Sequence, residues 1–250
     1  MELVFAGMTP SVAFGLLASS FAGSFIAVAL GTGGGVLVLS VMASLLPAAA
    51  LIPVHGVIQL GSNATRASLL ASHISWKPVA AFAGGSLVGV ALGGAVVVDL
   101  PAWAIQISIG LFVIWSILSK PPKWLSRNPM IIGGFASFLT MFFGATGIFV
   151  ANFTKSLALG RQAHVATHAV LMTLQHSLKI VTFAVLGFSF VPWLPFIMAM
   201  ILAGLLGTLV GRHVLIRMDE KMFKRALNFV LGLIALRLIW KGMSHLLGQG

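Results

Sequence analysis

Long apolar segments constrain the fold of this chain more than any other feature. Eight of them follow one another with only short polar connections. Crossing the hydrocarbon core of a bilayer, which is about 30 Å thick, takes about 20 apolar residues of helix. Segments of this length therefore predict helices that satisfy their own backbone polar groups in lipid. The segments cover residues 11–45, 48–72, 78–98, 102–119, 130–154, 162–187, 193–216 and 224–247.

The composition excludes a soluble globular domain. Hydrophobic residues make up 59% of the chain and charged residues only 8%, which leaves too little polar surface to cover a soluble domain of this size. The net charge of +11 comes mainly from Lys and Arg residues in the short connections. This pattern is typical of cytoplasmic loops near anionic lipid head groups, so it indicates a lipid bilayer as partner and no nucleic acid.

A polar stripe occurs twice at the same spacing inside the apolar segments. Its members are separated by 4, 7, 8 and 11 residues, which places each stripe on one face of a helix. Polar groups are costly in a bilayer and normally face a bundle interior, where they mark a substrate path. Both stripes contain cation-capable side chains and no carboxylate, which predicts a duplicated site for a small anion. The stripes are His55, Gln59, Ser62, Asn63 and Arg66, and His168, Met172, Gln175, His176 and Lys179.

Two glycine-rich stretches interrupt apolar segments ahead of the two stripes. Glycine lets the backbone leave helical geometry and lets another group approach closely. A helix that restarts after such a break presents free N–H groups to an anion, although close packing between helices is an alternative role for the glycines. The matched pair of breaks favours a substrate-facing role. Its candidate residues are Gly31, Thr32, Gly33 and Gly34, and Gly144, Thr146 and Gly147.

The chain divides into two similar halves at the basic, proline-containing residues 120–129. Each half contains a glycine-interrupted segment, a polar-striped segment, a glycine-rich segment and a closing segment. We therefore predict an internal duplication, with a first transmembrane module at 1–119, a linker at 120–129 and a second module at 130–250. Together the modules would form one integrated membrane domain.

The charge distribution decides between two topologies. If all eight segments cross the membrane, the Lys and Arg residues of the connections divide seven to six. If the first segment of each half folds back as a broken, re-entrant hairpin, eleven lie on one side and only Arg237 and Lys241 on the other. The tendency of basic loops to stay in the cytoplasm favours the second topology. The prediction is an all-α polytopic membrane protein with two modules, each a broken hairpin plus three transmembrane helices.

An odd number of spans per module makes the two modules inverted relative to each other, as in many secondary transporters. The stripes would then run in opposite directions and place cationic groups on both sides of a central site. The expected pairs are His55 with Lys179 in the outer half of the membrane, Arg66 with His168 in the inner half, and Asn63 with His176 near the midplane.

Each stripe residue also has a structural alternative. A histidine could bond a backbone carbonyl and only hold helices together, and Arg66 could extend toward the membrane surface. Lys179 lies well inside its segment without a carboxylate nearby, so an anionic substrate would supply its missing partner. Lys155 and Asn152 could line an inner vestibule, although Lys155 is also expected as an ordinary loop residue.

Enzyme chemistry finds no support in the sequence. The chain has no cysteine and only four acids, and it contains none of the common hydrolase motifs. His164 and His168 have a spacing that permits metal ligation, but acidic and thiol ligands are missing nearby. We expect no enzyme activity, no metal and no cofactor. If protons are coupled to transport, the histidines are the available carriers.

The pattern resembles the TauE/SafE family, also called the toluene sulfonate uptake permease family. The residues that carry the resemblance are Gly31–Gly35, Pro47, Pro53 and the stripe through Arg66, with 144–179 as the counterpart in the second half. It covers essentially the whole chain. The resemblance implies multi-pass transport in the bacterial inner membrane of sulfur-containing anions such as sulfite, sulfonate, sulfoacetate or thiosulfate. The glycine breaks and the stripe side chains would form the binding site.

The resulting expectation is a permease, that is, a secondary transporter for a small oxyanion. A passive anion channel could use the same groups as a selectivity ring. A non-transporting structural subunit of a membrane complex would instead bury the stripes as helix contacts. The sequence leaves a homodimer open, because it shows no interface signature.

Overall fold

The computed structural model describes residues 8–30, 33–97, 101–119, 122–214 and 220–248, and within these residues it contains helices and no strand. The predicted all-α fold is confirmed. Three short 3-10 helices are η1 (Ala71–His73), η2 (Lys123–Ser126) and η3 (Val191–Trp193). The α-helices are α1 (Pro10–Leu30), α2 (Gly34–Leu45), α3 (Ala48–Leu69), α4 (Val79–Val97), α5 (Ala102–Leu118), α6 (Pro129–Phe143), α7 (Gly147–Ser156), α8 (Arg161–Val185), α9 (Leu194–Val214) and α10 (Glu220–Leu246).

Both predicted glycine breaks separate two helices. α1 ends just before the first break, and α2 returns along it, with Gly34 packed directly against the carbonyl of Gly23. In the second half, Gly144 ends α6 in a conformation with φ of 72°, which favours glycine. α7 then starts at Gly147. Gly31 and Thr32, two of the candidate site residues, lie outside the described residues.

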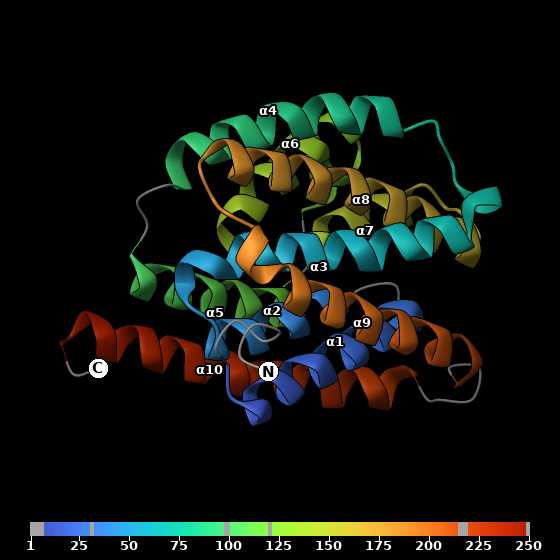
Figure 1. Cartoon of the computed structure of the whole chain (residues 1–250). Coiled ribbons are helices and arrows are strands. Elements are labelled where there is room, and N and C mark those ends of the chain that lie inside the picture. The colour runs from blue at the N-terminus through green and yellow to red at the C-terminus, as the bar shows by residue number, and fades with distance from the viewer. Residues whose placement is uncertain (1–7, 31–32, 98–100, 120–121, 215–219, 249–250) are drawn as a thin grey trace.

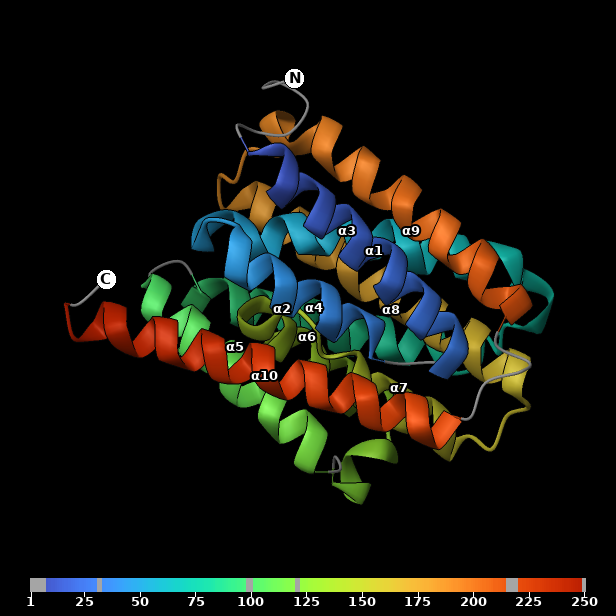
Figure 2. The same cartoon turned by 90° about the horizontal axis from the view of Figure 1, so that it is seen from below.

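The helices of the two halves pack in pairs across the molecule (Figures 1 and 2). α4 packs against α6, α1 against α9, α3 against α8, and α5 against α10. The counterparts of α1, α3, α4 and α5 in the second half are α6, α8, α9 and α10. Replacing each helix by its counterpart converts the pair α4–α6 into the pair α9–α1. The pairs α3–α8 and α5–α10 stay the same. Small residues allow the close approach: a side chain at Gly85 would meet the carbonyl of Met130, and one at Gly207 would meet that of Phe21.

The directions of the helices within these pairs follow from their contacts. In the pair α4–α6, Gly85 lies against Met130 and Gly93 against Phe138, so the two helices are parallel. In the pair α5–α10, Gly110 lies against Ala235, whereas Gly242 near the end of α10 lies against Trp103 near the start of α5. These two helices are therefore antiparallel.

The pair α3–α8 is also antiparallel. Gly56 near the start of α3 contacts Lys179 near the end of α8, and beyond α3 the backbone N–H of Ser75 donates to Thr167 Oγ1 at 3.0 Å. The pair lies between α4 on one side and α10 on the other (Figure 1).

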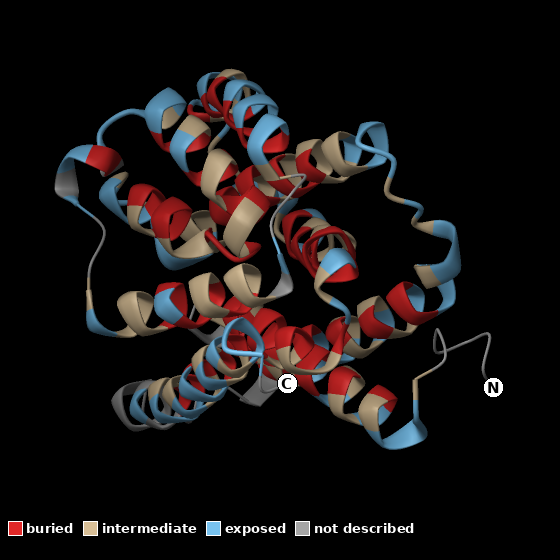
Figure 3. Ribbon diagram, turned by 90° about the vertical axis from the view of Figure 1, so that its left-hand side faces the viewer, coloured by how far each residue is buried: buried red, intermediate tan, exposed pale blue. Residues whose placement is uncertain are grey.

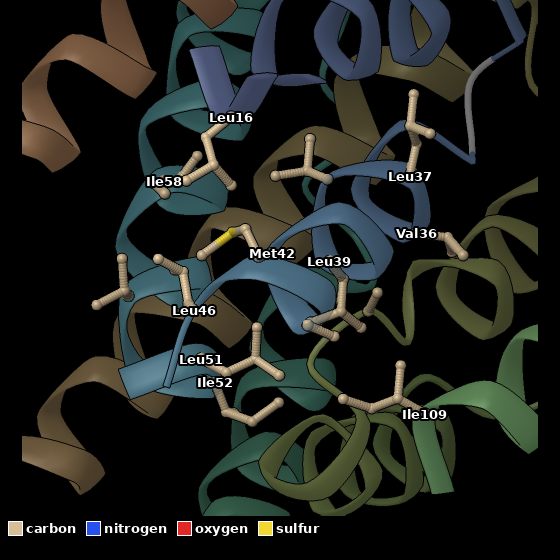
Figure 4. Packing of buried hydrophobic residues seen from close by; sticks show 14 of the residues in the cluster. Leu16, Val36, Leu37, Leu39, Met42, Leu46, Leu51, Ile52, Ile58 and Ile109 are labelled. Atoms are coloured by element: carbon tan, nitrogen blue, oxygen red, sulfur yellow. The ribbon is translucent and has the colours of Figure 1, made fainter. Parts of the chain in front are cut away.

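Apolar side chains cover both the interior and the outer surface of the bundle. A core cluster that includes Leu16, Met42, Leu51 and Ile58 joins α1, α2 and α3 (Figure 4). Exposed residues gather on the outward faces of the helices (Figure 3), and large hydrophobic side chains such as Phe229 are among them. Among the described residues, four segments are long and apolar enough to cross a membrane by length and composition: Pro10–Val28, Val79–Val97, Val191–Gly211 and Leu227–Leu246.

Candidate functional site

The two polar stripes face each other across the antiparallel pair α3–α8. His55 interacts electrostatically with Lys179 at one end, and Arg66 does so with His168 at the other. Between these ends, the rings of His55 and His176 meet edge to face at a centroid distance of 6.3 Å. Two of the three pairs expected from oppositely directed stripes, His55 with Lys179 and Arg66 with His168, therefore lie close enough to interact. All ten stripe side chains are buried.

A cavity of about 450 Å³ lies beside one part of the facing stripes. Six helices contribute most of its wall: α2, α3, α5, α7, α8 and α10. Eight of the candidate site residues that the structure describes line this cavity. They are Gly33, Gly34, Gln59, Asn63, Arg66, Gly147, His168 and His176.

The N-termini of two helices converge on this cavity. α2 begins at Gly34 after Gly33, whose φ of 94° is in the left-handed region that favours glycine. α7 begins at Gly147 after Thr146. The first N–H groups of a helix have no acceptor within the helix, and the helix dipole is positive there. Two such ends at one cavity create a favourable environment for an anion.

The first histidine of each stripe holds one of these helix starts. His55 Nε2 lies 3.1 Å from the carbonyl of Gly35, and His168 Nε2 lies 3.2 Å from the carbonyl of Gly147. Because a carbonyl can only accept, Nε2 is the donor in both bonds. The two bonds differ by one residue in their separation along the chain, 20 and 21 residues. They give both histidines the structural role that the sequence left open. His168 also lines the cavity, whereas His55 is not part of its wall.

Arg66 folds back along its helix rather than toward the membrane surface. Its Nη2 donates to Asn63 Oδ1 at 2.8 Å, and its Nε donates to the carbonyl of Ser62 at 3.3 Å. The side chain is 5% exposed and lines the cavity. The structure thus decides against the alternative of an arginine that extends to the interface. A guanidinium held in this way is a preorganised partner for an oxyanion.

Five of the described candidates lie outside the cavity wall: Gly144, Thr146, His55, Gln175 and Lys179. Gln175 Nε2 donates to Thr146 Oγ1 at 2.9 Å, and that hydroxyl donates to the carbonyl of Ala136, also at 2.9 Å. Lys179 Nζ lies 3.4 Å from the carbonyl of Gly144. These contacts tie the second stripe to the break between α6 and α7.

Several residues of the cavity wall had weak or missing signals in the sequence. Lys155 belongs to the last turn of α7 rather than to a loop, and together with Asn152 and His164 it lines the cavity. Ser116 and Asn228, from α5 and α10, were not predicted. Neither belongs to a repeated polar stripe, and only the cost of a polar group in lipid could have marked them.

The sequence model of the sulfite exporter TauE/SafE family matches residues 16–238. No curated protein and no solved structure matches the chain. The matched region contains both glycine breaks, both stripes and every described residue that lines the cavity. The family consists of membrane transporters, and the apolar helices of the structure agree with a multi-pass membrane protein. The chain therefore belongs to the TauE/SafE sulfite exporter family.

Proposed function

We propose that this protein is a secondary transporter that moves a small sulfur-containing oxyanion, such as sulfite, sulfonate, sulfoacetate or thiosulfate, across the bacterial inner membrane. One observation carries the proposal. The N-termini of α2 and α7 and the buried guanidinium of Arg66 all face one cavity in a bundle of apolar helices. The family match supports the choice of sulfur-containing anions.

The chemistry of the cavity suits an oxyanion. Free N–H groups at the helix starts, the guanidinium of Arg66 and the side chains of Asn63 and His176 can all donate hydrogen bonds to anionic oxygens. None of the described residues that line the cavity is an acid. Of the four acids of the chain, Glu220 begins α10, and Glu2, Asp99 and Asp219 lie outside the described residues. A negative charge in the cavity would therefore meet only positive or neutral groups.

Two inverted modules would provide alternating access to this site. The antiparallel pairs α3–α8 and α5–α10 support this arrangement, because each pairs a helix with its own counterpart in the other half. We assign the modules to residues 1–119 and 130–250, joined by the linker at 120–129.

Basic residues concentrate at the ends of α7 and α9 and at the starts of α8 and α10, which favours a cytoplasmic location for these helix ends. The cavity reaches the exposed Lys155 at this end, and we therefore propose that the structure represents an inward-facing state.

The test is counterflow of labelled sulfite and sulfonates in proteoliposomes that contain only this protein. We expect saturable, trans-stimulated exchange in the wild type. Arg66→Ala should lower it about tenfold to a hundredfold, because a hydrogen bond to a charged group contributes about 1.5–3 kcal/mol. Arg66→Lys keeps the charge but loses the planar guanidinium, so its exchange rate should lie between those of the wild type and Arg66→Ala. Arg127→Ala, at an exposed position before α6, is the matched control.

Other results would support a different function for this protein. Flux that neither saturates nor responds to anion on the opposite side would indicate a channel. A well-folded wild type without any flux would favour a structural subunit. Normal exchange by Arg66→Ala would remove the cavity from the substrate path.

A further inference from the structure

Behind the cavity lies a cluster of three cation-capable side chains: His55, His176 and Lys179. Their exposed fractions are 0%, 1% and 0%. His55 comes from α3 and the other two from α8, so the cluster belongs to the interface of the two stripes. His176 is the member that lines the cavity, and Lys179 and His55 interact electrostatically with it. The cluster thus begins at the cavity and continues into the closed part of the protein.

Two nitrogens of this cluster, Lys179 Nζ and His176 Nδ1, are weakly bonded for such deep burial. The distance from Lys179 Nζ to the carbonyl of Gly144 is 3.4 Å, at the long end for a hydrogen bond. His176 Nδ1 has no hydrogen-bond partner among the described residues. A buried polar nitrogen without a partner costs free energy, so native proteins keep such groups mainly where they have a function.

In the part of the chain that the structure describes, no fixed negative charge balances the cluster. The charged or titratable side chains near it are His168 and His164 on α8 itself, Arg66 on α3, and Lys155 on α7 at the cavity. α2, α4, α5 and α6 also pack around this pair of helices, and their sequences contain no ionisable residue; the basic residues of α9 are confined to its last turn. An additional proton on the cluster would therefore be opposed by burial and by like charges.

An anion in the cavity changes this balance. Bound between the helix starts and Arg66, it would lie next to His176 and supply the negative charge that the cluster lacks. If the anion favours protonation of the cluster, a proton on the cluster favours binding of the anion by the same factor. Anion and proton would then occupy the protein together.

We propose that His55, His176 and Lys179 form the proton-coupling site of this transporter, so that a proton crosses the membrane together with the anion. The inference rests on the proposed transport function. The proton enters from the water in the cavity, binds a nitrogen of His176 or Lys179, and leaves toward the opposite side once the Lys179 end opens. Release of Lys179 from the Gly144 carbonyl, at the break between α6 and α7, is the movement that would expose it.

Two assays on the same proteoliposomes separate this inference from the proposed function. Counterflow without any gradient measures anion exchange alone. Uptake driven by a pH gradient, with the membrane potential clamped by potassium and valinomycin, measures coupling. The probes are labelled thiosulfate and methanesulfonate, because their charges do not change over the pH range used. With one proton per anion, a gradient of about one pH unit should drive about tenfold accumulation in the wild type.

The variants are Lys179→Arg, which keeps a cation that cannot release its proton, and His176→Gln, which keeps polarity but cannot titrate. Lys179→Arg should retain counterflow and lose the accumulation driven by the pH gradient. Because His176 lines the cavity, the accumulation of His176→Gln is compared with its own counterflow, and it should be lost at whatever counterflow remains. His73→Gln, at an exposed histidine of η1, is the control and should behave like the wild type. A purely structural role would lower counterflow and accumulation together.

Three results would overturn the inference. Wild-type counterflow that is indifferent to the pH gradient would remove proton coupling and leave the proposed transport intact. Full accumulation by both variants would remove the cluster from the coupling site. Absence of wild-type counterflow for both probes would overturn the transport function and the coupling together.

Discussion

At Thr146, a single hydroxyl joins the second stripe to the helix before the glycine break. It accepts a hydrogen bond from Gln175 and donates one to the carbonyl of Ala136, and the side chain is fully buried. The residue was predicted to contact substrate, but in this structure it lies outside the cavity wall. Its contacts indicate that it supports the position of α7, whose N-terminus faces the cavity.

Replacing Thr146 by Val should therefore lower stability rather than only substrate binding. The valine keeps the shape and leaves the Gln175 amide without its partner, which costs about 1–3 kcal/mol. Thr146→Ser keeps the hydroxyl and should lose less. Thermal unfolding of the detergent-solubilised variants measures the difference, and equal midpoints for Thr146→Val and wild type would contradict this role.

At the scale of helices, glycine determines how closely the two halves approach. α4 and α6 meet at Gly85 and Gly89, where an added Cβ would collide with the backbone of Met130 and Gly134. Backbone atoms cannot move aside as the end of a flexible side chain can, so the helix pair would have to separate. Neighbouring Gly84 has open space at the same position.

This contrast between adjacent glycines predicts opposite effects of the same substitution. Gly85→Ala should destabilise the protein by about 1–3 kcal/mol through overpacking. Gly84→Ala should be neutral or stabilise by up to about 1 kcal/mol, because alanine favours the helix. Thermal unfolding in detergent is again the measurement. If Gly85→Ala were as stable as Gly84→Ala, the close packing of α4 against α6 would be wrong.

At the scale of the whole molecule, the connections between helices should lie on two sides of the membrane. If the modules are inverted, the directions of the paired helices place the end of α3 and the start of α6 on one side, and the end of α8 and the end of α10 on the other. Basic residues favour the cytoplasm for the first group. The chain has no cysteine, so single cysteines can report these positions without background.

Single-cysteine labelling therefore tests the inverted arrangement. Ser72→Cys and Arg127→Cys should react with a membrane-impermeant maleimide only from the cytoplasmic side. Val191→Cys and Leu247→Cys should react only from the opposite side. All four positions are exposed in the structure. Labelling of Arg127→Cys and Leu247→Cys from the same side would rule out the inverted modules, whereas total loss of labelling after detergent treatment would indicate misfolding.

Much of the fold was readable from the sequence because its signals are local. Apolar length marks the helices, glycine marks the two breaks, and the 4, 7, 8 and 11 spacing marks the helix faces that become buried. The contributions of Ser116 and Asn228 were not readable, because a single polar residue does not reveal which helix it will face. Lys155 was misassigned to a loop for a similar reason: the short helix α7 has a basic last turn that resembles a connection.

The sequence by itself determined that the chain forms apolar helices, where two of them break, and that two equivalent cationic stripes face inward. These properties depend on the cost of polar groups in lipid and on helical periodicity, which need no tertiary information. Only the tertiary structure decided that Arg66 and His168 line a cavity while His55 and Lys179 are closed off. The two stripes have the same spacing and similar chemistry, so they are equivalent in sequence. The difference arises because the carbonyl of Gly144 contacts Lys179, while Arg66 folds back onto Asn63 and leaves room for the cavity.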